Sequence, residues 1–491
     1  MSLILVALSC MVSGIQESGS FGIHVVDAAT QRGVPLITLE TTNRIRLVTD
    51  SAGRVAFLEP GLMDRAVYFS VSGPGYSYPQ DGFGFAGVTL RTTPGARAEI
   101  KVARTIIAER LCRLTGTGIY RDSELLGDDV AASLVRPSRG VASPVMGQDS
   151  VQVTAWRGRL LWIWGDTSLA RYPLGNFHGT GALTDHPAPG GLDPIQGVSF
   201  EYLLDDDGNV RRMMPVEEPG AVWLDGLLAV ADAGGKEVVL AHYARMKSLG
   251  EQLEHGIARL DEEGVFRKVK ELPAASVWQH PRGHAVQGRE RGGDYLYFAA
   301  PFCTTRVPAR AAAIMDPAAY EALAWDGGAG SCVWQKVLDP ITQATEAQLI
   351  KEASLPASSA LLQVTDAGTH KAVTLHAGSV RWNDFRQRWI LIAVELGGDE
   401  SFLGEVWYVE AQRIEGPWGK GVKVASHPSY SFYNPCHHDF FDQEGGKVIY
   451  FEGTYSETFS GAKVATPRYD YNQLLYRLDL SDARLAPARV E

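Results

Sequence analysis

The 491-residue sequence predicts an all-β protein on the basis of three observations. The chain contains 52 glycines and 11 tryptophans, a composition that suits a turn-rich β protein better than a helical one. Short segments of alternating polar and apolar residues recur between Gly- and Asp-rich turns, which is typical of antiparallel strands. Polar residues also precede apolar runs at intervals, and we interpret these runs as the inner strands of blades. This arrangement favours a β-propeller with polar side chains around its axis.

At this length two domains are expected. Residues 1–20 are interpreted as a signal peptide or disordered start, and residues 21–103 as a small β-sandwich. Residues 104–112 are expected to form a short connecting helix. Residues 113–491 then form the propeller, for which five blades are favoured and six or seven remain possible.

The start of the predicted sandwich carries a recognisable pattern. Residues 25–36 read Val-x-Asp-x-x-Thr-x-x-Gly-Val-Pro-Leu, and residues 49–55 read Thr-Asp-x-x-Gly-x-Val. This pattern resembles the carboxypeptidase regulatory-like domain, which has a transthyretin-like fold. The resemblance implies an accessory role rather than chemistry.

Composition excludes some classes of protein and favours others. The net charge of −11, without a cluster of Lys and Arg, argues against nucleic acid as a partner. The first 14 residues are apolar but too few to span a bilayer, and small residues at Val12–Gly14 suggest a signal-peptidase site. A secreted or periplasmic protein without a transmembrane segment is therefore expected, with a buried first strand as the alternative.

Four cysteines follow the predicted leader: Cys112, Cys303, Cys332 and Cys436. None is spaced as Cys-x-x-Cys, so a structural zinc site is not predicted. A Cys303–Cys332 disulfide and buried free thiols are both compatible with the sequence.

Residues 147–167 are the most informative segment. Asp149 precedes a short alternating strand, an Arg-Gly-Arg turn follows, and the apolar run Leu160–Trp164 ends near Asp166. This layout predicts a hairpin with acids at its mouth. Comparable polar segments recur at four further places: Val222–Asp225, His280–His284, His376 with Arg381, and His437 with His438.

Together these features resemble the five-bladed propeller glycoside hydrolases around family 43. By context, Asp149 matches the acid of the first blade, Asp225 that of the second, and His438 the histidine of the last. Residues 164–167, Trp-Gly-Asp-Thr, are closer to a related propeller family that includes endo-D-arabinanases. The resemblance implies cleavage of glycosidic bonds in a poly- or oligosaccharide, with a structural Ca²⁺ on the axis or His438 as a metal ligand.

One position departs from that pattern. Where family 43 enzymes carry a Glu in the third blade, residues 280–284 read His-Pro-Arg-Gly-His. Glycoside hydrolysis needs two carboxyl groups, one that donates a proton and one that activates water or attacks. We assign Asp149 as the base or nucleophile. The candidates for the proton-donating acid are Asp166 and Glu452, with Glu405 as a further one. Asp225 would orient the acid or raise its pKa. The alternative for Asp166 is a turn cap.

A rival hypothesis is a lyase acting on a uronic acid sugar, in which Arg or His neutralises the carboxylate and Tyr or His removes a proton. Its candidate bases are Tyr433, Tyr455 and Tyr469. The candidate substrate-binding residues are His178, Trp223, Arg282, His284, Arg381, Trp382, His437, His438 and Tyr455. Trp223 and Trp382 are the candidate sugar platforms. A carbohydrate-binding surface protein is the third hypothesis.

Overall fold

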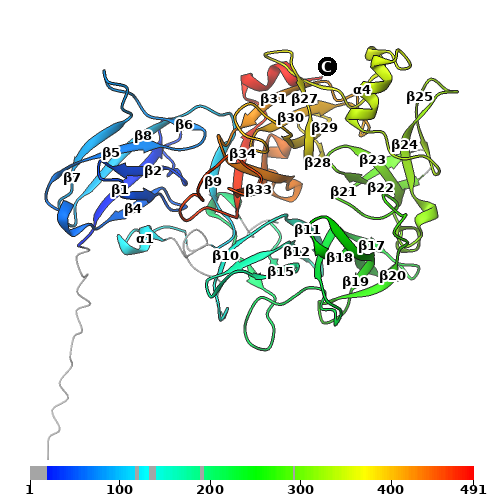
Figure 1. Cartoon of the computed structure of the whole chain (residues 1–491), viewed down its shortest axis with the longest axis horizontal. Coiled ribbons are helices and arrows are strands. Elements are labelled where there is room, and N and C mark those ends of the chain that lie inside the picture. The colour runs from blue at the N-terminus through cyan, green and yellow to red at the C-terminus, as the bar shows by residue number, and fades with distance from the viewer. Residues whose placement is uncertain (1–18, 117–120, 132–139, 188–192, 291–292, 491) are drawn as a thin grey trace, which may run out of the picture.

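The computed structural model describes residues 19–116, 121–131, 140–187, 193–290 and 293–490. It shows a small sandwich of N-terminal strands beside a ring of five sheets (Figure 1). The predicted signal peptide lies almost wholly outside the described residues. Within the described ranges, none of the helices has the length and apolar character needed to cross a membrane.

The sandwich consists of two four-stranded sheets. The first has the order β4-β1-β8-β6 and the second the order β3-β2-β5-β7. The strands are β1 (Phe21–Asp27), β2 (Thr38–Thr41), β3 (Arg46–Val48), β4 (Arg54–Phe57), β5 (Ala66–Ser72), β6 (Tyr76–Ser77), β7 (Gly87–Arg91) and β8 (Arg97–Arg104). Their apolar faces meet in one core, where Phe57 contacts Phe69 edge to face at 5.2 Å.

Among the described residues the ring consists of five blades, whose strands are antiparallel apart from one parallel pair at the outer edge of blade 4. Blade 1 contains β11 (Gln152–Trp156), β12 (Arg159–Trp164), β15 (Thr180–Thr184) and β16 (Glu201–Tyr202). Blade 2 contains β17 (Ala221–Ala231), β18 (Glu237–Ser248), β19 (Glu251–Leu260) and β20 (Phe266–Glu271). Blade 3 contains β21 (His284–Glu290), β22 (Gly293–Ala299), β23 (Cys303–Pro308), β24 (Glu321–Asp326) and β25 (Ser331–Gln335).

The last two blades complete the ring. Blade 4 contains β28 (Leu375–Asn383), β29 (Arg388–Glu395), β30 (Val406–Ala411), β31 (Lys420–Ala425), β26 (Val364–Asp366) and β27 (Ala372–Val373). Blade 5 contains β32 (Ser431–His437), β33 (Val448–Ser456), β34 (Asn472–Asp479) and β9 (Glu109–Arg113). A small sheet beside blade 1 has β10 (Val145–Gln148), β13 (Thr167–Leu169) and β14 (Tyr172–Asn176).

Helices are few and short in the part of the chain that the structure describes. The α-helices are α1 (Asp122–Leu125), α3 (Ala311–Ile314) and α4 (Gln343–Lys351). The 3₁₀ turns are η1 (Pro60–Leu62), η2 (Pro194–Gln196), η3 (Pro317–Ala319), η4 (Ala357–Ser359), η5 (Asp439–Phe441), η6 (Glu444–Gly446) and η7 (Ala483–Ala488). The all-β class and the five blades are therefore confirmed, and residues 303–375 supply outer strands and short helices rather than a sixth blade.

The first strand of each blade is the innermost. Strand β11 contacts β17, β17 contacts β21, β21 contacts β28, and β28 contacts β32. The apolar runs that the sequence suggested as inner strands are mostly the second strands, such as Leu160–Trp164 in β12. A second strand lies between two neighbours and is covered on both faces, so it becomes continuously apolar. The prediction that these apolar runs form the innermost strands was therefore wrong, because most of them lie one strand further from the axis.

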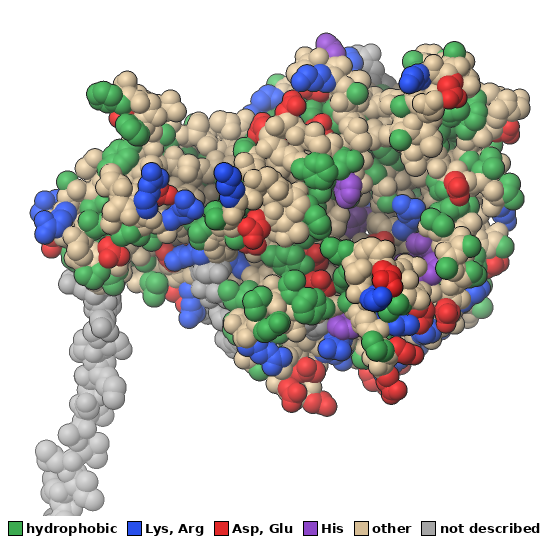
Figure 2. Space-filling view, viewed as in Figure 1, with side chains coloured by type: hydrophobic (Ala, Val, Ile, Leu, Met, Phe, Trp, Pro, Cys, Tyr) green, Lys and Arg blue, Asp and Glu red, His purple; other side chains and the backbone are tan. Residues whose placement is uncertain are grey.

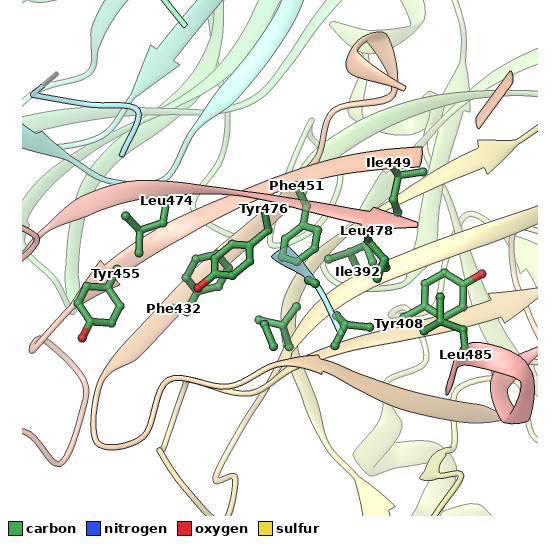
Figure 3. Close-up of a cluster of buried hydrophobic side chains, with 14 of the residues drawn as sticks. Ile392, Tyr408, Phe432, Ile449, Phe451, Tyr455, Leu474, Tyr476, Leu478 and Leu485 are labelled. Carbon is green, nitrogen blue, oxygen red and sulfur yellow. The ribbon is translucent and has the colours of Figure 1, made fainter. Parts of the chain in front are cut away.

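Large aromatic side chains fill the space between blades 4 and 5 (Figure 3). Phe432 contacts Tyr476 edge to face at 5.4 Å, and the Phe451 ring stacks on Tyr476 at the same distance. These rings are fully buried, and each adds both apolar area and a geometric preference to the contact. The packing holds neighbouring blades at a fixed angle around the axis.

Strand β9 corrects the sequence prediction for residues 104–112. Residues Glu109–Arg113 are extended and pair antiparallel with β34, so an N-terminal strand forms the outer edge of the last blade. The sequence analysis predicted a short connecting helix here. All five residues are buried, and the charged Glu109 has partners in both domains: Arg477 of β34 donates to it at 2.6 Å and Thr30 of the sandwich at 3.2 Å. Tertiary pairing overrides local propensity here.

Arg110 joins the sandwich to the propeller. Its guanidinium is 1% exposed and donates to the carbonyls of Pro35 at 2.9 Å and Pro74 at 2.7 Å. It also lies 3.5 Å from the Tyr476 hydroxyl in blade 5. Since buried carbonyls need a donor, this one side chain satisfies sandwich backbone from within the propeller.

We expect Arg110→Ala to lower the free energy of unfolding by about 3 kcal/mol, because two buried carbonyls lose their donor. Urea unfolding followed by tryptophan fluorescence measures this. The exposed Arg259, whose side chain makes no hydrogen bond to the described residues, provides the control, and Arg259→Ala should change stability by less than about 0.5 kcal/mol. Equal effects of the two substitutions would contradict this account of the domain junction.

Candidate active site

A cavity of about 480 Å³ opens at one end of the propeller axis. All five blades contribute to it through the starts of their first strands or the residues just before them. Figure 2 shows histidine side chains at a recess between the blades. The ionisable residues that line the cavity are Asp149, Asp166, Asp225, Arg282, His284, His376 and Tyr433.

Asp149 lies just before β11 and is held by the neighbouring blade. Its Oδ2 accepts a hydrogen bond from the Tyr433 hydroxyl at 3.1 Å. Its Oδ1 lies so close to Gly165 that a Cβ added there would sit 2.2 Å from it. The glycine at position 165 is therefore what lets this carboxyl group pack between β11 and the end of β12.

Asp166 follows Gly165 and faces blade 2. Its Oδ1 accepts a hydrogen bond from the indole Nε1 of Trp223 at 2.8 Å. No hydrogen bond from Asp166 to its own turn is found among the described residues, so the turn-cap alternative is not what the structure shows. Asp149 and Asp166 thus approach the same cavity from the two ends of one hairpin.

Burial perturbs both acids. Burial, with a smaller contribution from the negative charge of Asp166, raises the pKa of Asp149 to about 7. Burial also raises the pKa of Asp166, although the hydrogen bond from Trp223 lowers it. Two acids with raised pKa at one cavity are a recurrent feature of acid–base sites.

Asp225 holds the loop before β21. Its Oδ2 accepts from the Gly283 amide at 3.0 Å, and its Oδ1 accepts from the Gln152 side chain at 3.1 Å. Gly226 has φ +60° and lies against Pro281 and Arg282, where a Cβ would come within 2.4 Å of backbone atoms. Both contacts fix the position at which Arg282 and His284 enter the cavity.

Arg282 is a cation without a protein partner in the described structure. It is partly exposed to the cavity, and no ion pair or hydrogen bond of its side chain is found among the described residues. Its charge lowers the pKa of Asp225 slightly against the stronger effect of burial, which raises it. A guanidinium that lines a cavity in this way is available to a ligand carboxylate or other anion.

The structure places some predicted residues elsewhere. Glu452 is 1% exposed and its Oε1 lies 2.6 Å from Nε2 of His438, and neither residue lines the cavity. His437 is also buried, with Nε2 at 2.9 Å from Asp442. Glu452 as the proton donor and His438 at the rim are therefore not supported by this geometry, since neither side chain reaches the cavity.

The remaining candidates fall into three places. Arg381 and Trp382 line a second cavity that is built from the opposite ends of the first strands. His178 is buried and its Nδ1 accepts from the Val222 amide at 3.0 Å. The other candidates lie away from both cavities. The Tyr455 hydroxyl is hydrogen-bonded to Thr466, the Tyr469 hydroxyl donates to the Thr49 carbonyl, and Glu405 forms an ion pair with Lys423.

The centre of the axis does not suit the Ca²⁺ that the family resemblance implies. Below the cavity, Cys436 Sγ lies 3.5 Å from His284 Nδ1 and 3.8 Å from His438 Nδ1. Calcium prefers six to eight oxygen ligands, whereas these donors are imidazole nitrogens and a thiol. Burial raises the pKa of Cys436 to about 12, so it is a neutral thiol. Cys112, Cys303, Cys332 and Cys436 are all free.

Several residues of the site were not predicted. Gln152, Leu403 and Phe459 line the cavity, and Leu249 reaches it from the tip of the β18–β19 hairpin. Apolar residues in loops carry no periodic signal, so sequence alone does not mark them. His242 and His255 were missed as well, although a hairpin centred near residue 250 brings them close together.

Comparison with known proteins gives only structural likenesses. No protein-family model matches the chain, and no curated protein is similar to it. The carboxypeptidase regulatory-like resemblance of the sandwich therefore stays a prediction.

Solved structures similar to the chain include enzymes named as members of glycoside hydrolase family GH43. One is a β-1,3-galactosidase of family GH43, with 10% identity over 67% of this chain and 56% of that chain and a TM-score of 0.32. Another is a GH43_1 enzyme from Xanthomonas citri complexed with xylotriose, with 12% identity over 70% of this chain and 90% of that chain and a TM-score of 0.33. A third is an exo-1,5-α-L-arabinanase from a bovine ruminal metagenomic library, with 10% identity over 69% of this chain and 94% of that chain and a TM-score of 0.33. This chain spans little more than half of the galactosidase.

We expect the stability of Asp149→Asn relative to wild type to depend on pH. The pKa of Asp149 in the folded protein is about 7, against an ordinary aspartate value of 3.8, so wild-type stability falls as pH rises between these values. Asparagine does not titrate, so the stability of the variant relative to wild type should rise from pH 5 to pH 8 by about 2–3 kcal/mol. Melting temperatures at both pH values test this, and a pH-independent difference would contradict the raised pKa.

Proposed function

We propose that the protein is an exported glycoside hydrolase that cleaves a poly- or oligosaccharide in the axial cavity. The observation that carries the proposal is the pair Asp149 and Asp166, two acids with raised pKa at the mouth of one cavity. The cavity walls include Trp223 and Phe459, whose rings suit the apolar faces of a sugar. A cavity of about 480 Å³ has room for a small number of sugar units.

The pKa shifts favour Asp149 as the acid and Asp166 as the base or nucleophile, which reverses the roles that the sequence suggested. Asp149 has a pKa of about 7, so it is largely protonated below neutral pH and can donate its proton to the leaving glycosidic oxygen. Asp166 then acts as the carboxylate that removes a proton from the attacking water, or attacks the anomeric carbon itself. Asp225 acts indirectly, because its hydrogen bonds position the loop that carries Arg282.

The unpaired Arg282 favours an acidic sugar as the substrate. A carboxylate or sulfate on one sugar ring would form charge-assisted hydrogen bonds with the guanidinium. Asp225 accepts a hydrogen bond from the Gly283 amide and none from the Arg282 side chain, so the guanidinium of Arg282 can bind the ligand.

A second candidate function is elimination from a uronic acid sugar. Tyr433 supports it, because its hydroxyl lies in the cavity with Arg282 and is hydrogen-bonded to Asp149, which could accept its proton. In that reaction Arg282 neutralises the sugar carboxylate, and Tyr433 takes the proton at C5 while its own proton passes to Asp149. The C4–O bond then breaks, a C4–C5 double bond forms, and the departing oxygen is protonated by Tyr433. The product then carries a double bond, whereas hydrolysis leaves a saturated sugar.

Asp149→Asn should lower kcat by at least about 100-fold, because the amide cannot transfer a proton. The assay follows reducing ends and ultraviolet absorbance of unsaturated uronate on a panel of neutral and acidic polysaccharides. Reducing ends without absorbance indicate hydrolysis, both together indicate a lyase, and binding without either indicates a carbohydrate-binding protein. Wild-type activity should also fall above about pH 7, as Asp149 loses its proton.

The matched control is Asp399→Asn on the surface, where the aspartate side chain is 84% exposed, and it should keep full activity. Unchanged turnover in Asp149→Asn would remove Asp149 from the mechanism.

Arg282→Gln should lower kcat/KM for a uronate-containing glycan by about 10- to 100-fold, mostly through KM, since a charge-assisted hydrogen bond is lost. The same variant should act on a neutral glycan as wild type does. Arg259→Gln serves as the surface control. Equal losses on acidic and neutral substrates would show that Arg282 does not recognise an anion.

A further inference from the structure

Three histidines gather beside the second blade, outside the cavity. His242 lies on β18, His255 on β19, and His280 in the loop that leads to β21. One ring nitrogen from each lies within 4.8 Å of those of the other two. Among the described residues this is the one group of three or more His, Cys, Asp or Glu side chains that is close enough to hold a metal ion.

The contacts within this histidine cluster are specific. His242 Nε2 lies 3.0 Å from His255 Nδ1, which is close to the separation of two nitrogens bound to one metal ion. The His280 ring stacks on His242 with centroids 3.9 Å apart and meets His255 at an interplanar angle of 83°. His280 comes from a loop, so its ring can tilt out of the stack to direct a nitrogen at a shared ion.

Backbone carbonyls orient two of the three rings. His255 Nε2 lies 2.9 Å from the Pro273 carbonyl, and His280 Nδ1 lies 2.9 Å from the Pro281 carbonyl. A ring N–H that donates to a carbonyl fixes the tautomer and leaves the other nitrogen unprotonated, which is the usual arrangement around metal-bound histidine. His242 and His255 are 6% and 4% exposed, so water contributes little to holding these rings.

We propose that His242, His255 and His280 bind a divalent transition-metal ion of the Zn²⁺ class. Three imidazoles without a carboxylate suit Zn²⁺, Cu²⁺ or Ni²⁺ and do not suit Ca²⁺ or Mg²⁺, which prefer oxygen. Three protein ligands leave a fourth position for water. The nearby Arg282 carries a positive charge, which weakens binding of a cation and must be overcome by the three nitrogens.

The site would act on the loop that enters the cavity. His280 is two residues from Arg282 and four from His284, both of which line the cavity. His242 is also the cross-strand partner of Asp225, which binds the Gly283 amide. An ion at the histidine cluster would therefore hold residues 280–284 against blade 2 and fix the position of the Arg282 guanidinium. This proposal does not depend on the reaction catalysed.

The test uses the full chain without an affinity tag, stripped with a chelator and titrated with Zn²⁺ against a chromophoric competitor. Wild type should bind one equivalent, and Zn²⁺ should raise the melting temperature reversibly with EDTA. His280→Gln and His255→Gln should each weaken binding more than tenfold, and the exposed His370→Gln should leave it unchanged. His280 is partly buried in a loop, so its variant should fold even where the His255 variant does not.

Cobalt provides a second measurement that needs no variant. Co²⁺ bound by three histidines and water should give the intense visible absorption of a tetrahedral site, and Zn²⁺ should abolish it. Absence of saturable binding by wild type, or undiminished binding by His280→Gln, would show that the three rings form only a hydrogen-bonded stack. Either result leaves the glycoside hydrolase proposal untouched, because no step of the test measures turnover.

Discussion

The pairing of β9 with β34 is the constraint on which the rest of the propeller depends. A ring of blades brings residues from distant parts of the chain to one axis only if its first and last blades are held together. Here an N-terminal strand completes the last blade, and Arg110 extends the same junction into the sandwich. The cavity then places Asp149 of blade 1 within hydrogen-bonding distance of Tyr433 of blade 5, across the seam of the ring.

Placing two carboxyl groups in one cavity is unfavourable, and the surrounding structure offsets that cost. Asp149 and Asp166 both lose water, which raises their pKa, and the negative charge of Asp166 adds to the effect on Asp149. The Tyr433 hydroxyl and the Trp223 indole donate to them from the two neighbouring blades. Such strained groups are typical of sites selected for chemistry rather than for stability. The glycine at position 165 is part of the same arrangement, because no larger residue leaves room for Asp149.

Much of the fold was predictable because its signals are local. Strand alternation and glycine-rich turns indicate β-structure, and the position of Asp149 before a strand places it at the mouth of a blade. Strand β9 was not predictable in this way, because its partner β34 lies more than 350 residues further along the chain. Glu452 and His438 were misplaced for a related reason: the sequence indicates a strand mouth but not which strand is innermost. Glu452 lies on the second strand, β33, and His438 is hydrogen-bonded to it there.

The side-chain clusters show the same division between local and distant signals. Trp223 and Arg282 were predicted as ligand-binding residues from their place beside polar segments, and both line the cavity. Their hydrogen-bond status required coordinates: Trp223 donates to Asp166, and Arg282 is left without a partner among the described residues. The pairing of His242 with His255 follows from the register of one hairpin, but their contact with His280 depends on how blade 3 packs against blade 2.

The most direct measurement is a crystal structure of Asp149→Asn with an oligosaccharide that the wild-type protein cleaves. The account predicts a sugar chain in the axial cavity, with its scissile oxygen between residues 149 and 166 and an anionic group on Arg282. A chain bound at the opposite end of the axis, beside Arg381 and Trp382, would contradict it.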